Sequence, residues 1–235
     1  MRPARPGRTG ARRTLRTGDA IGAHGDVQAR RALVEGDPSM GRIVTTVNAP
    51  RSDPPAGRSD SVPTIHAARL DLVSLDRWSI EAILDGRITD AEDLLGLSLP
   101  ADIGMASGLL RLRLADLRSV PTVQAWLLRI VTVREPTRRM VGLAGFHGPP
   151  NGHGEVEFGC EILAGDRRRG YASETAGALL EWAAREHGVR RFVASVGPQN
   201  APSLGLVAKL GFRQERSPWD LTGGPELPFR MELPG

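Results

Sequence analysis

The sequence predicts an α/β fold, with a mixed and mostly antiparallel sheet flanked by helices. Three segments that favour strands follow one another between residues 126 and 163. They are followed by a helix–strand–helix–strand order and preceded by one strand and several helices. With 235 residues, of which 40% are hydrophobic, the chain is long enough for one well-packed domain. We therefore expect a sheet with helices on its faces.

Residues 1–62 differ in composition from the rest of the chain. They are rich in Arg, Gly and Pro and contain few large apolar side chains. Such a segment buries too little surface to offset the entropy lost on ordering. We expect residues 1–62 to be a disordered tail and residues 63–235 to form the folded domain. A basic arm that grips RNA or an acidic partner is the alternative reading, as is a translation start at Met40.

The first elements of the folded part are one strand and three helices. Residues 65–75 alternate apolar with polar side chains, which predicts a half-buried strand. Residues 78–84 carry an apolar stripe at helical spacing. Thr89 followed by Glu92 is a capping-box signature for a short helix. A longer helix is expected over residues 102–117.

The second half of the chain begins with a series of predicted strands. Residues 126–133, 139–146 and 155–163 read as consecutive antiparallel strands, because turn-rich stretches separate them. The elements expected next are a helix, a strand, a helix and a closing strand over residues 172–187, 190–196, 202–210 and 228–233.

Cysteine usage and hydropathy exclude several classes of protein. Cys160 is the single cysteine, so neither an intramolecular disulfide nor a thiolate metal cluster can form within one chain. We expect a small buried side chain there, with a reactive thiol as the alternative. No apolar run is long enough to span a bilayer and no secretory signal is evident, so we expect no membrane partner and a cytoplasmic location.

The charge balance points only weakly to nucleic acid. The formal net charge is +4 and the isoelectric point is about 10.4, which favours polyanionic partners. Lys209 is nevertheless the only lysine among 31 basic residues, and much of the excess lies in the first sixty residues. We therefore expect no nucleic-acid partner for the folded part.

Residues 157–174 predict a strand that leads through a basic turn into a helix. Arg167, Arg168 and Arg169 stand directly before Gly170. A glycine lets the backbone approach a phosphate closely, and the N-terminus of the next helix directs unpaired N–H groups and a positive dipole end to the same place. The turn is therefore predicted to bind an anion.

This turn resembles a signature of the GNAT superfamily of N-acetyltransferases. Arg167-x-x-Gly170-x-Ala172 is similar to the motif Gln/Arg-x-x-Gly-x-Gly/Ala, whose backbone amides bind the pyrophosphate of acetyl-CoA. The resemblance implies acetyl-CoA as the acetyl donor. The residues that it implies around the pyrophosphate are Arg167, Arg168, Arg169, Gly170, Tyr171, Ala172 and Ser173.

A second block strengthens the resemblance. Asn200-Ala-Pro-Ser203 followed by Lys209-Leu-Gly-Phe212 is similar to the family's Asn-x-x-Ser and Lys-Leu-Gly-Phe sequences, in the right order and about thirty residues after the first block. Asn200 and Ser203 are implied to line the cofactor site. The opening strand, with Arg69-Leu-Asp-Leu, also resembles the branch that includes the ribosomal-protein N-terminal acetyltransferases.

The resemblance covers about residues 63–233 and implies a geometry for the cofactor. The family has a splay between two central strands, here those ending near Leu163 and running over residues 190–196, and the pantetheine arm lies in it. Backbone groups near Ile162 and Leu163 are implied to bind this arm. A primary amine, either on a small molecule or at a protein N-terminus, would then attack the thioester directly.

Two carboxylates on the strand before the turn are candidates for removing the amine's proton. Glu157 and Glu161 share a face by strand alternation, unless a bulge near Gly159 changes the parity. Glu157 lies ten residues before Arg167, which is similar to the placement of the base glutamate in histone acetyltransferases of the superfamily. We expect Glu157 to act as base or to position a water, with Glu161 as the second candidate and a purely structural role for both as the alternative.

One position departs from the family pattern. Many members carry a tyrosine that can protonate the leaving thiolate where this chain has Val207. Ser203 is proposed instead as a hydrogen-bond donor to the thiolate, although it is also placed to cap or line the last helix. A thiolate of ordinary pKa needs little acid help near neutral pH.

Other site classes find less support. His147 and His153 lie in a turn-rich segment without metal-ligand spacing, so we expect solvated loop histidines and no metal. We then expect an amine acceptor as the partner. The sequence does not decide whether the chain forms a homodimer. Two alternatives to an active enzyme are an acyl-CoA-binding module without turnover, suggested by Val207, and a nucleic-acid-associated protein that uses its basic N-terminal arm.

Overall fold

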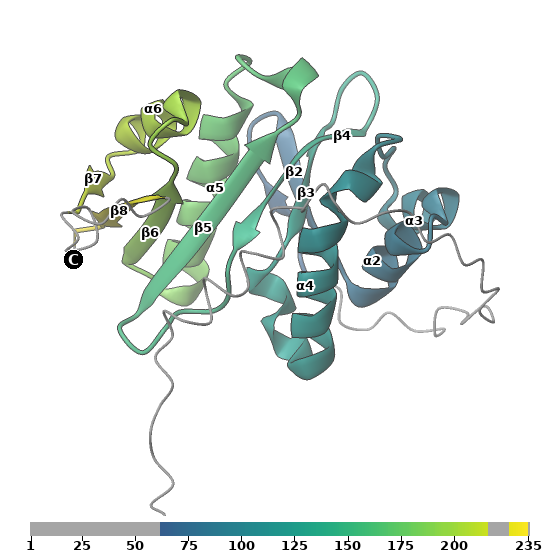
Figure 1. Cartoon of the computed structure of the whole chain (residues 1–235), viewed down its shortest axis with the longest axis horizontal. Coiled ribbons are helices and arrows are strands. Elements are labelled where there is room, and N and C mark those ends of the chain that lie inside the picture. Colours follow the sequence, from purple (N-terminus) through teal and green to yellow (C-terminus); the bar gives the residue numbers. More distant parts are fainter. Residues whose placement is uncertain (1–61, 216–225, 235) are drawn as a thin grey trace, which may run out of the picture.

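The computed structural model describes residues 62–215 and 226–234, and these build one eight-stranded sheet (Figure 1). The expected tail, residues 1–62, lies outside the described residues except for Val62. The strands are β1 (Ile65–His66), β2 (Leu70–Ser74), β3 (Arg129–Val133), β4 (Arg139–Phe146), β5 (Glu155–Ile162), β6 (Arg191–Val196), β7 (Arg213–Gln214) and β8 (Leu227–Glu232). The α-helices are α2 (Arg77–Leu84), α3 (Ile88–Leu95), α4 (Ser107–Ser119), α5 (Tyr171–His187) and α6 (Ala201–Lys209). Three short 3₁₀ helices complete the description: η1 (Ile103–Ala106), η2 (Pro121–Trp126) and η3 (Ala164–Asp166).

The sheet has the strand order β1-β2-β3-β4-β5-β6-β8-β7. Every neighbouring pair is antiparallel except β5 and β6, which are parallel. The parallel pair needs a crossover, and α5 supplies it. The predicted mixed and mostly antiparallel sheet is confirmed.

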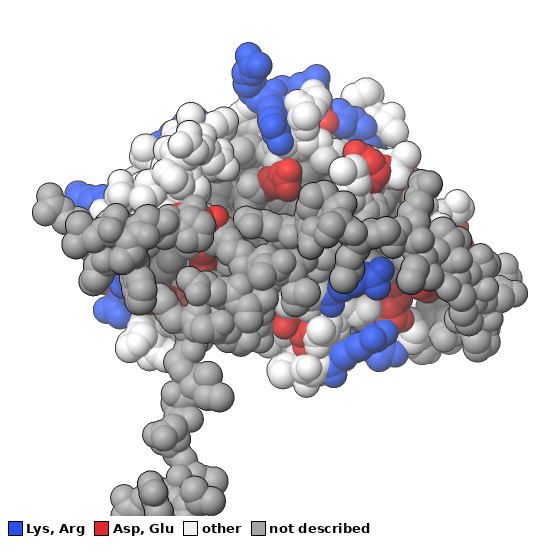
Figure 2. Space-filling view, in the orientation of Figure 1, with Lys and Arg blue, Asp and Glu red and all other residues white. Residues whose placement is uncertain are grey.

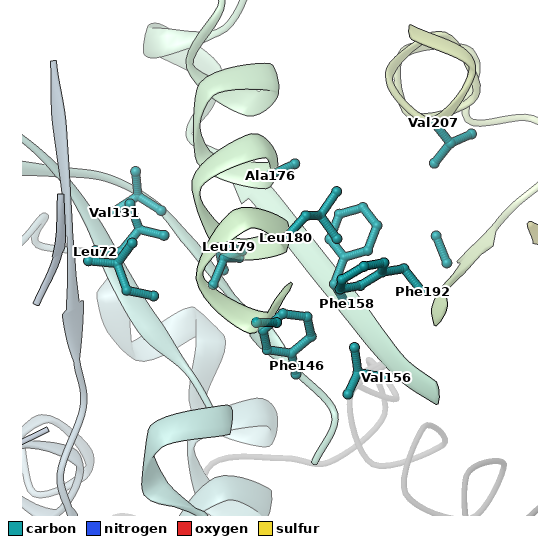
Figure 3. Close-up of a cluster of buried hydrophobic side chains, with 14 of the residues drawn as sticks. Leu72, Val131, Phe146, Val156, Phe158, Ala176, Leu179, Leu180, Phe192 and Val207 are labelled. Carbon is teal, nitrogen blue, oxygen red and sulfur yellow. The ribbon is translucent and has the colours of Figure 1, made fainter. Parts of the chain in front are cut away.

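Helices cover both faces of the sheet and enclose two apolar cores. One core lies between the sheet and α5, where Leu179 and Leu180 meet Phe146 and Phe158 (Figure 3). The other lies between the opposite face and α2, α3 and α4, with Ile80 and Leu110 fully buried there. Burial on both faces explains why β4 is apolar after Arg139 and why every residue of β3 is buried.

Several predicted elements change where tertiary contacts compete with local pattern. The strand expected over residues 65–75 is the hairpin β1–β2. The capping box at Thr89 is wrong: Arg87 is the N-cap without a side-chain bond, and the Glu92 carboxylate accepts from the backbone N–H of Leu99 at 2.8 Å. The start of the expected strand 126–133 is instead the end of η2. The two-residue strand β7 was not predicted.

The neighbours β5 and β6 separate part of the way along β5. They pair only from Glu155 to Glu157, opposite Arg191 to Val193. β5 stays paired with β4 as far as Ile162, without any register shift. From Phe158 onward one edge of β5 is therefore left without its parallel neighbour, which is the expected splay between the central strands.

Candidate active site

The turn before α5 has a backbone that suits an anion. Gly170 is the N-cap with φ 81°, and Arg168 has φ 62°. Both lie in the left-handed region, where only glycine is unstrained. The first amide of the helix that bonds within it is that of Glu174, which donates to the Gly170 carbonyl at 3.1 Å. The N–H groups of the first turn before it point out of the helix end together with the positive end of its dipole.

Ion pairs to one buried carboxylate hold the turn in place. The Asp166 carboxylate is 8% exposed and accepts two hydrogen bonds from Arg139, at 2.8 and 2.9 Å. Arg169 lies 3.6 Å from the same carboxylate. The hydrogen bonds and charge of Arg139, together with the charge of Arg169, hold the pKa of Asp166 below its usual range. These contacts fix the turn to β4. They also pair part of the positive charge of Arg169 with a carboxylate of the protein.

A second anchor comes from the β1–β2 connection, a hundred residues earlier. Arg69 donates to the Glu174 carboxylate from its backbone N–H at 2.6 Å and from Nε at 2.8 Å. Its Nη2 donates to the Arg169 carbonyl at 3.1 Å. Its guanidinium carbon also lies 4.9 Å from the centre of the Tyr171 ring. Sequence reasoning missed this role of Arg69, because no local pattern links it to α5.

Arginine side chains gather over the connection between β5 and α5. Arg167, Arg168 and Arg169 are all exposed, and Figure 2 shows basic side chains at this upper edge of the molecule. The Arg167 Nε donates to the Ile162 carbonyl at 2.9 Å, so this arginine also ties the end of β5 to the turn. The three arginines at the start of the predicted segment therefore place positive charge at this edge of the molecule.

Some peptide groups of β5 point into the opening that is left where β6 separates from β5. The Leu163 N–H donates to the Val141 carbonyl at 2.9 Å. By the alternation of an antiparallel ladder, the peptide groups of Ile162 and Cys160 then point away from β4 and toward the opening. The Leu163 carbonyl accepts from the Asp166 N–H at 2.9 Å, so both peptide groups of Leu163 already have partners. Of the two residues expected to bind pantetheine, Ile162 presents a backbone N–H to the opening and Leu163 does not.

The second sequence block forms the start of α6. The Asn200 side chain accepts from the Ser203 N–H at 3.2 Å and caps the helix. Ser203 is half-buried and lies one turn before Val207, on the same face of the helix. Val207 is 2% exposed and points into the core beside β6 (Figure 3). The position that carries tyrosine in many family members is here a packed core residue.

Glu157 lies at the point where β5 and β6 begin to separate. One of its oxygens accepts from the Ser195 hydroxyl at 2.7 Å. The other lies 3.2 Å from His147 Nδ1. Its side chain is 19% exposed. His147 follows β4 directly and is exposed, as expected of a loop histidine, and its N–H donates to the Glu157 carbonyl at 2.8 Å.

Glu161 shares the face of Glu157 but has a different environment. The register of β5 runs without a bulge through Gly159, so strand alternation holds. The Glu161 side chain is 75% exposed, and its ion-pair partner is Arg167 at 3.9 Å. The sheet irregularity is instead in the β3–β4 pairing, next to Val131. Of the two carboxylates, Glu157 is the one held in a defined position.

Cys160 shows the features of an unreactive thiol. Burial, with a smaller contribution from the Glu161 charge, raises the pKa of Cys160 to about 12. The thiol therefore stays protonated near neutral pH, and nucleophilic chemistry needs the thiolate.

Among residues 62–215 and 226–234, no helix combines the length and apolar character needed to cross a membrane. The same residues contain no group of three or more His, Cys, Asp and Glu side chains arranged to hold a metal ion.

Comparison with known proteins agrees with this arrangement. Residues 99–213 match the family model of the acetyltransferase (GNAT) domain. The chain is 34% identical over 82 residues to the uncharacterized N-acetyltransferase YjdG of Bacillus subtilis, a segment that is 35% of this chain and 49% of that protein. The chain thus spans about half the length of the curated relatives that it matches.

Solved structures share the fold over a larger part of the chain. An acetyltransferase of Agrobacterium tumefaciens is 25% identical with a TM-score of 0.50, and the match covers 77% of this chain and 100% of that one. RimJ of Mycobacterium smegmatis, solved in complex with CoA-disulfide, is 17% identical with a TM-score of 0.51, covering 73% and 88%.

Proposed function

Because this chain contains a GNAT acetyltransferase domain, we propose that it binds acetyl-CoA and transfers the acetyl group to a primary amine. The observation that carries the proposal is the position of the anion-binding turn. It lies directly at the end of β5, where that strand has lost its parallel neighbour. One extended ligand can therefore have its phosphates at the turn and its flexible arm along the free edge of β5.

The residues divide into three sets along that ligand. We assign the pyrophosphate to the backbone N–H groups from Gly170 to Ser173 and to the charges of Arg167, Arg168 and Arg169. The pantetheine arm is assigned to the outward peptide groups of Cys160 and to the N–H of Ile162, whose carbonyl already accepts from Arg167. Asn200 shapes the start of α6 by capping it, and Ser203 on that helix is proposed to donate a hydrogen bond to the thiolate that leaves.

Carboxylates are proposed to assist removal of the amine's proton. Glu157 is the first candidate, because Ser195 and His147 hold it in one position beside the opening of the sheet. Glu161, which is exposed on the same strand face, is the second. The acceptor is a small molecule or a protein N-terminus, and residues 63–235 are proposed to be the catalytic domain.

A thiol-release assay with acetyl-CoA and a broad panel of primary amines tests the proposal. We expect at least one amine to give turnover well above the rate without acceptor. Calorimetry should show saturable acetyl-CoA binding. Binding without turnover on any amine would favour the acyl-CoA-binding module, and absence of binding would reject the cofactor assignment.

The anchor formed by Arg69 leads to a first mutational prediction. Arg69→Met removes the guanidinium that links Glu174 and the Arg169 carbonyl, so the turn should be less ordered before the cofactor binds. We expect calorimetry to show acetyl-CoA affinity weaker by about fivefold, since a partly exposed ion pair contributes about 1 kcal/mol.

Arg87→Met is the matched control for this variant. Arg87 is similarly exposed, and its ion pairs within the described residues are to its near neighbours Asp85 and Asp90, at the start of α3. Equal effects of both substitutions would show that general loss of charge, not order of the turn, changes the affinity.

A further inference from the structure

His147, the residue that follows β4, lies directly opposite Glu157 of β5. The pairing of Gly145 with Gly159 and of Phe146 with Phe158 continues to His147 and Glu157, whose backbones are bonded at 2.8 Å. Residues directly opposite in an antiparallel pair place their side chains on the same face. The 3.2 Å contact of His147 Nδ1 with the Glu157 carboxylate is therefore imposed by the sheet register.

Beside this pair, the strand face has no side chain. Gly145 and Gly159 are the next residues opposite each other. A Cβ at Gly145 would lie 2.3 Å from the Leu127 carbonyl oxygen, so that position is covered. A Cβ at Gly159 would meet only His147 Nε2, at 3.5 Å. The space above Gly159 is open, and the second imidazole nitrogen stands at its edge.

This space also borders the expected thioester position. Gly159 lies in the part of β5 that has no β6 partner, and the next residue, Cys160, directs its peptide groups to the opening. A ligand arm that follows the free edge of β5 therefore passes one end of the space above Gly159. An acceptor that enters from the face of Glu157 reaches that edge beside His147 Nε2.

We propose that His147 Nε2 accepts the proton of the acceptor amine and that Glu157 acts through this imidazole as a positioning residue. The inference rests on the proposed acetyl transfer. The 3.2 Å contact of Nδ1 with the Glu157 carboxylate favours a proton on Nδ1, which leaves Nε2 as the basic nitrogen. Ser195 holds the other Glu157 oxygen, so the carboxylate and the ring orient each other in the manner of a carboxylate–imidazole dyad.

The proton transfers and the acetyl transfer need no reactant besides His147, the acceptor amine, acetyl-CoA and water. His147 Nε2 takes one proton from the ammonium form of the acceptor and leaves a neutral amine. The amine nitrogen attacks the thioester carbonyl carbon, a C–N bond forms and the C–S bond breaks. The thiolate leaves with the sulfur electron pair and receives the second nitrogen proton as the amide forms. The proton on His147 passes to water, to which its 44% exposed side chain has access.

The groups around His147 are consistent with this role. Glu157 of β5 faces the ring directly, and Ser195 of β6 is neutral. From α4, Arg113 Nη1 lies 3.4 Å from the His147 carbonyl, but it also pairs with Asp116 at 3.0 Å, so its charge is largely compensated. Glu161, further along β5, is exposed to solvent. Imidazole is the side chain whose ordinary titration range suits proton transfer near neutral pH.

The test uses the full chain, acetyl-CoA and the amine that gives the fastest wild-type turnover in the panel. His147→Gln should bind acetyl-CoA like the wild type but turn over more slowly by about 10² to 10⁴. The deficit should shrink as the pH rises and more of the amine is already neutral. Added imidazole should accelerate His147→Ala, because a free base can occupy the space above Gly159. His153→Gln, in the exposed β4–β5 loop, is the matched control and should keep the wild-type rate.

Three outcomes would overturn the inference. If His147→Gln keeps the wild-type rate, the proton goes directly to Glu157 or elsewhere, and only this inference is overturned. If His147→Ala is slow but unaffected by imidazole, the histidine is structural and the inference is again overturned. If the wild type binds acetyl-CoA yet acetylates no amine, the proposed function fails and takes this inference with it.

Discussion

Gly170→Asp should abolish measurable acetyl-CoA binding while leaving the fold in place. The substitution puts a carboxylate where the pyrophosphate is expected to approach the backbone, at the N-terminus of the seventeen-residue helix α5. Aspartate adopts a left-handed backbone more readily than most residues, so the strain at a φ of 81° is smaller for it than for other side chains. A Cβ at this position would meet only Arg69 Nη2, at 3.4 Å. We expect an affinity loss of more than about 100-fold in calorimetry, which corresponds to about 2.7 kcal/mol.

Gly170→Asn separates charge from shape in this experiment. Asparagine has nearly the same size and the same tolerance of the left-handed region but carries no charge. It should therefore lose much less affinity than aspartate. Thermal melts of both variants check that the domain is intact. Wild-type affinity in a folded Gly170→Asp protein would show that the phosphates bind elsewhere.

Glu157→Gln should slow turnover by about 10² to 10⁴ while acetyl-CoA affinity holds. Glutamine keeps the size of the side chain and can still accept from Ser195. It cannot act as a base, and its amide N–H₂ would no longer favour the imidazole form with a proton on Nδ1. Steady-state thiol release across a pH series measures the effect. The deficit should become smaller at higher pH, where less proton removal is needed.

Glu161→Gln is the control on the same strand face. Its carboxylate is 75% exposed and is held only by a 3.9 Å contact with Arg167, so the substitution should have little effect on turnover. A slow Glu161→Gln beside a normal Glu157→Gln would exchange the two roles. Wild-type rates for both would remove the carboxylates of β5 from the chemistry.

Local sequence was enough to predict the parts of the molecule whose conformation depends on near neighbours. The predicted strand over residues 139–146 and the predicted helix over 172–187 agree with β4 and α5 to within one residue. Gly170 and Gly188 mark the two ends of α5 because each adopts a positive φ that other side chains avoid. The turn could be predicted to bind an anion for the same reason, since glycine, charge and helix start are consecutive in the chain.

Only the tertiary structure decided which distant residues meet at the site. Sheet register sets His147 opposite Glu157 and brings Ser195 to the same carboxylate, and it turns the Leu163 amide away from the opening. Tertiary structure also decided the partner of Arg69, which binds Glu174 of α5. It likewise decided the partner of Glu92, whose carboxylate accepts from the backbone N–H of Leu99 and does not form the expected capping box. Hydrophobic alternation shows that a strand has an inner face but not which strand lies beside it or in which register. The candidate site could therefore be located from the sequence, whereas the partners of its charged groups required the assembled sheet.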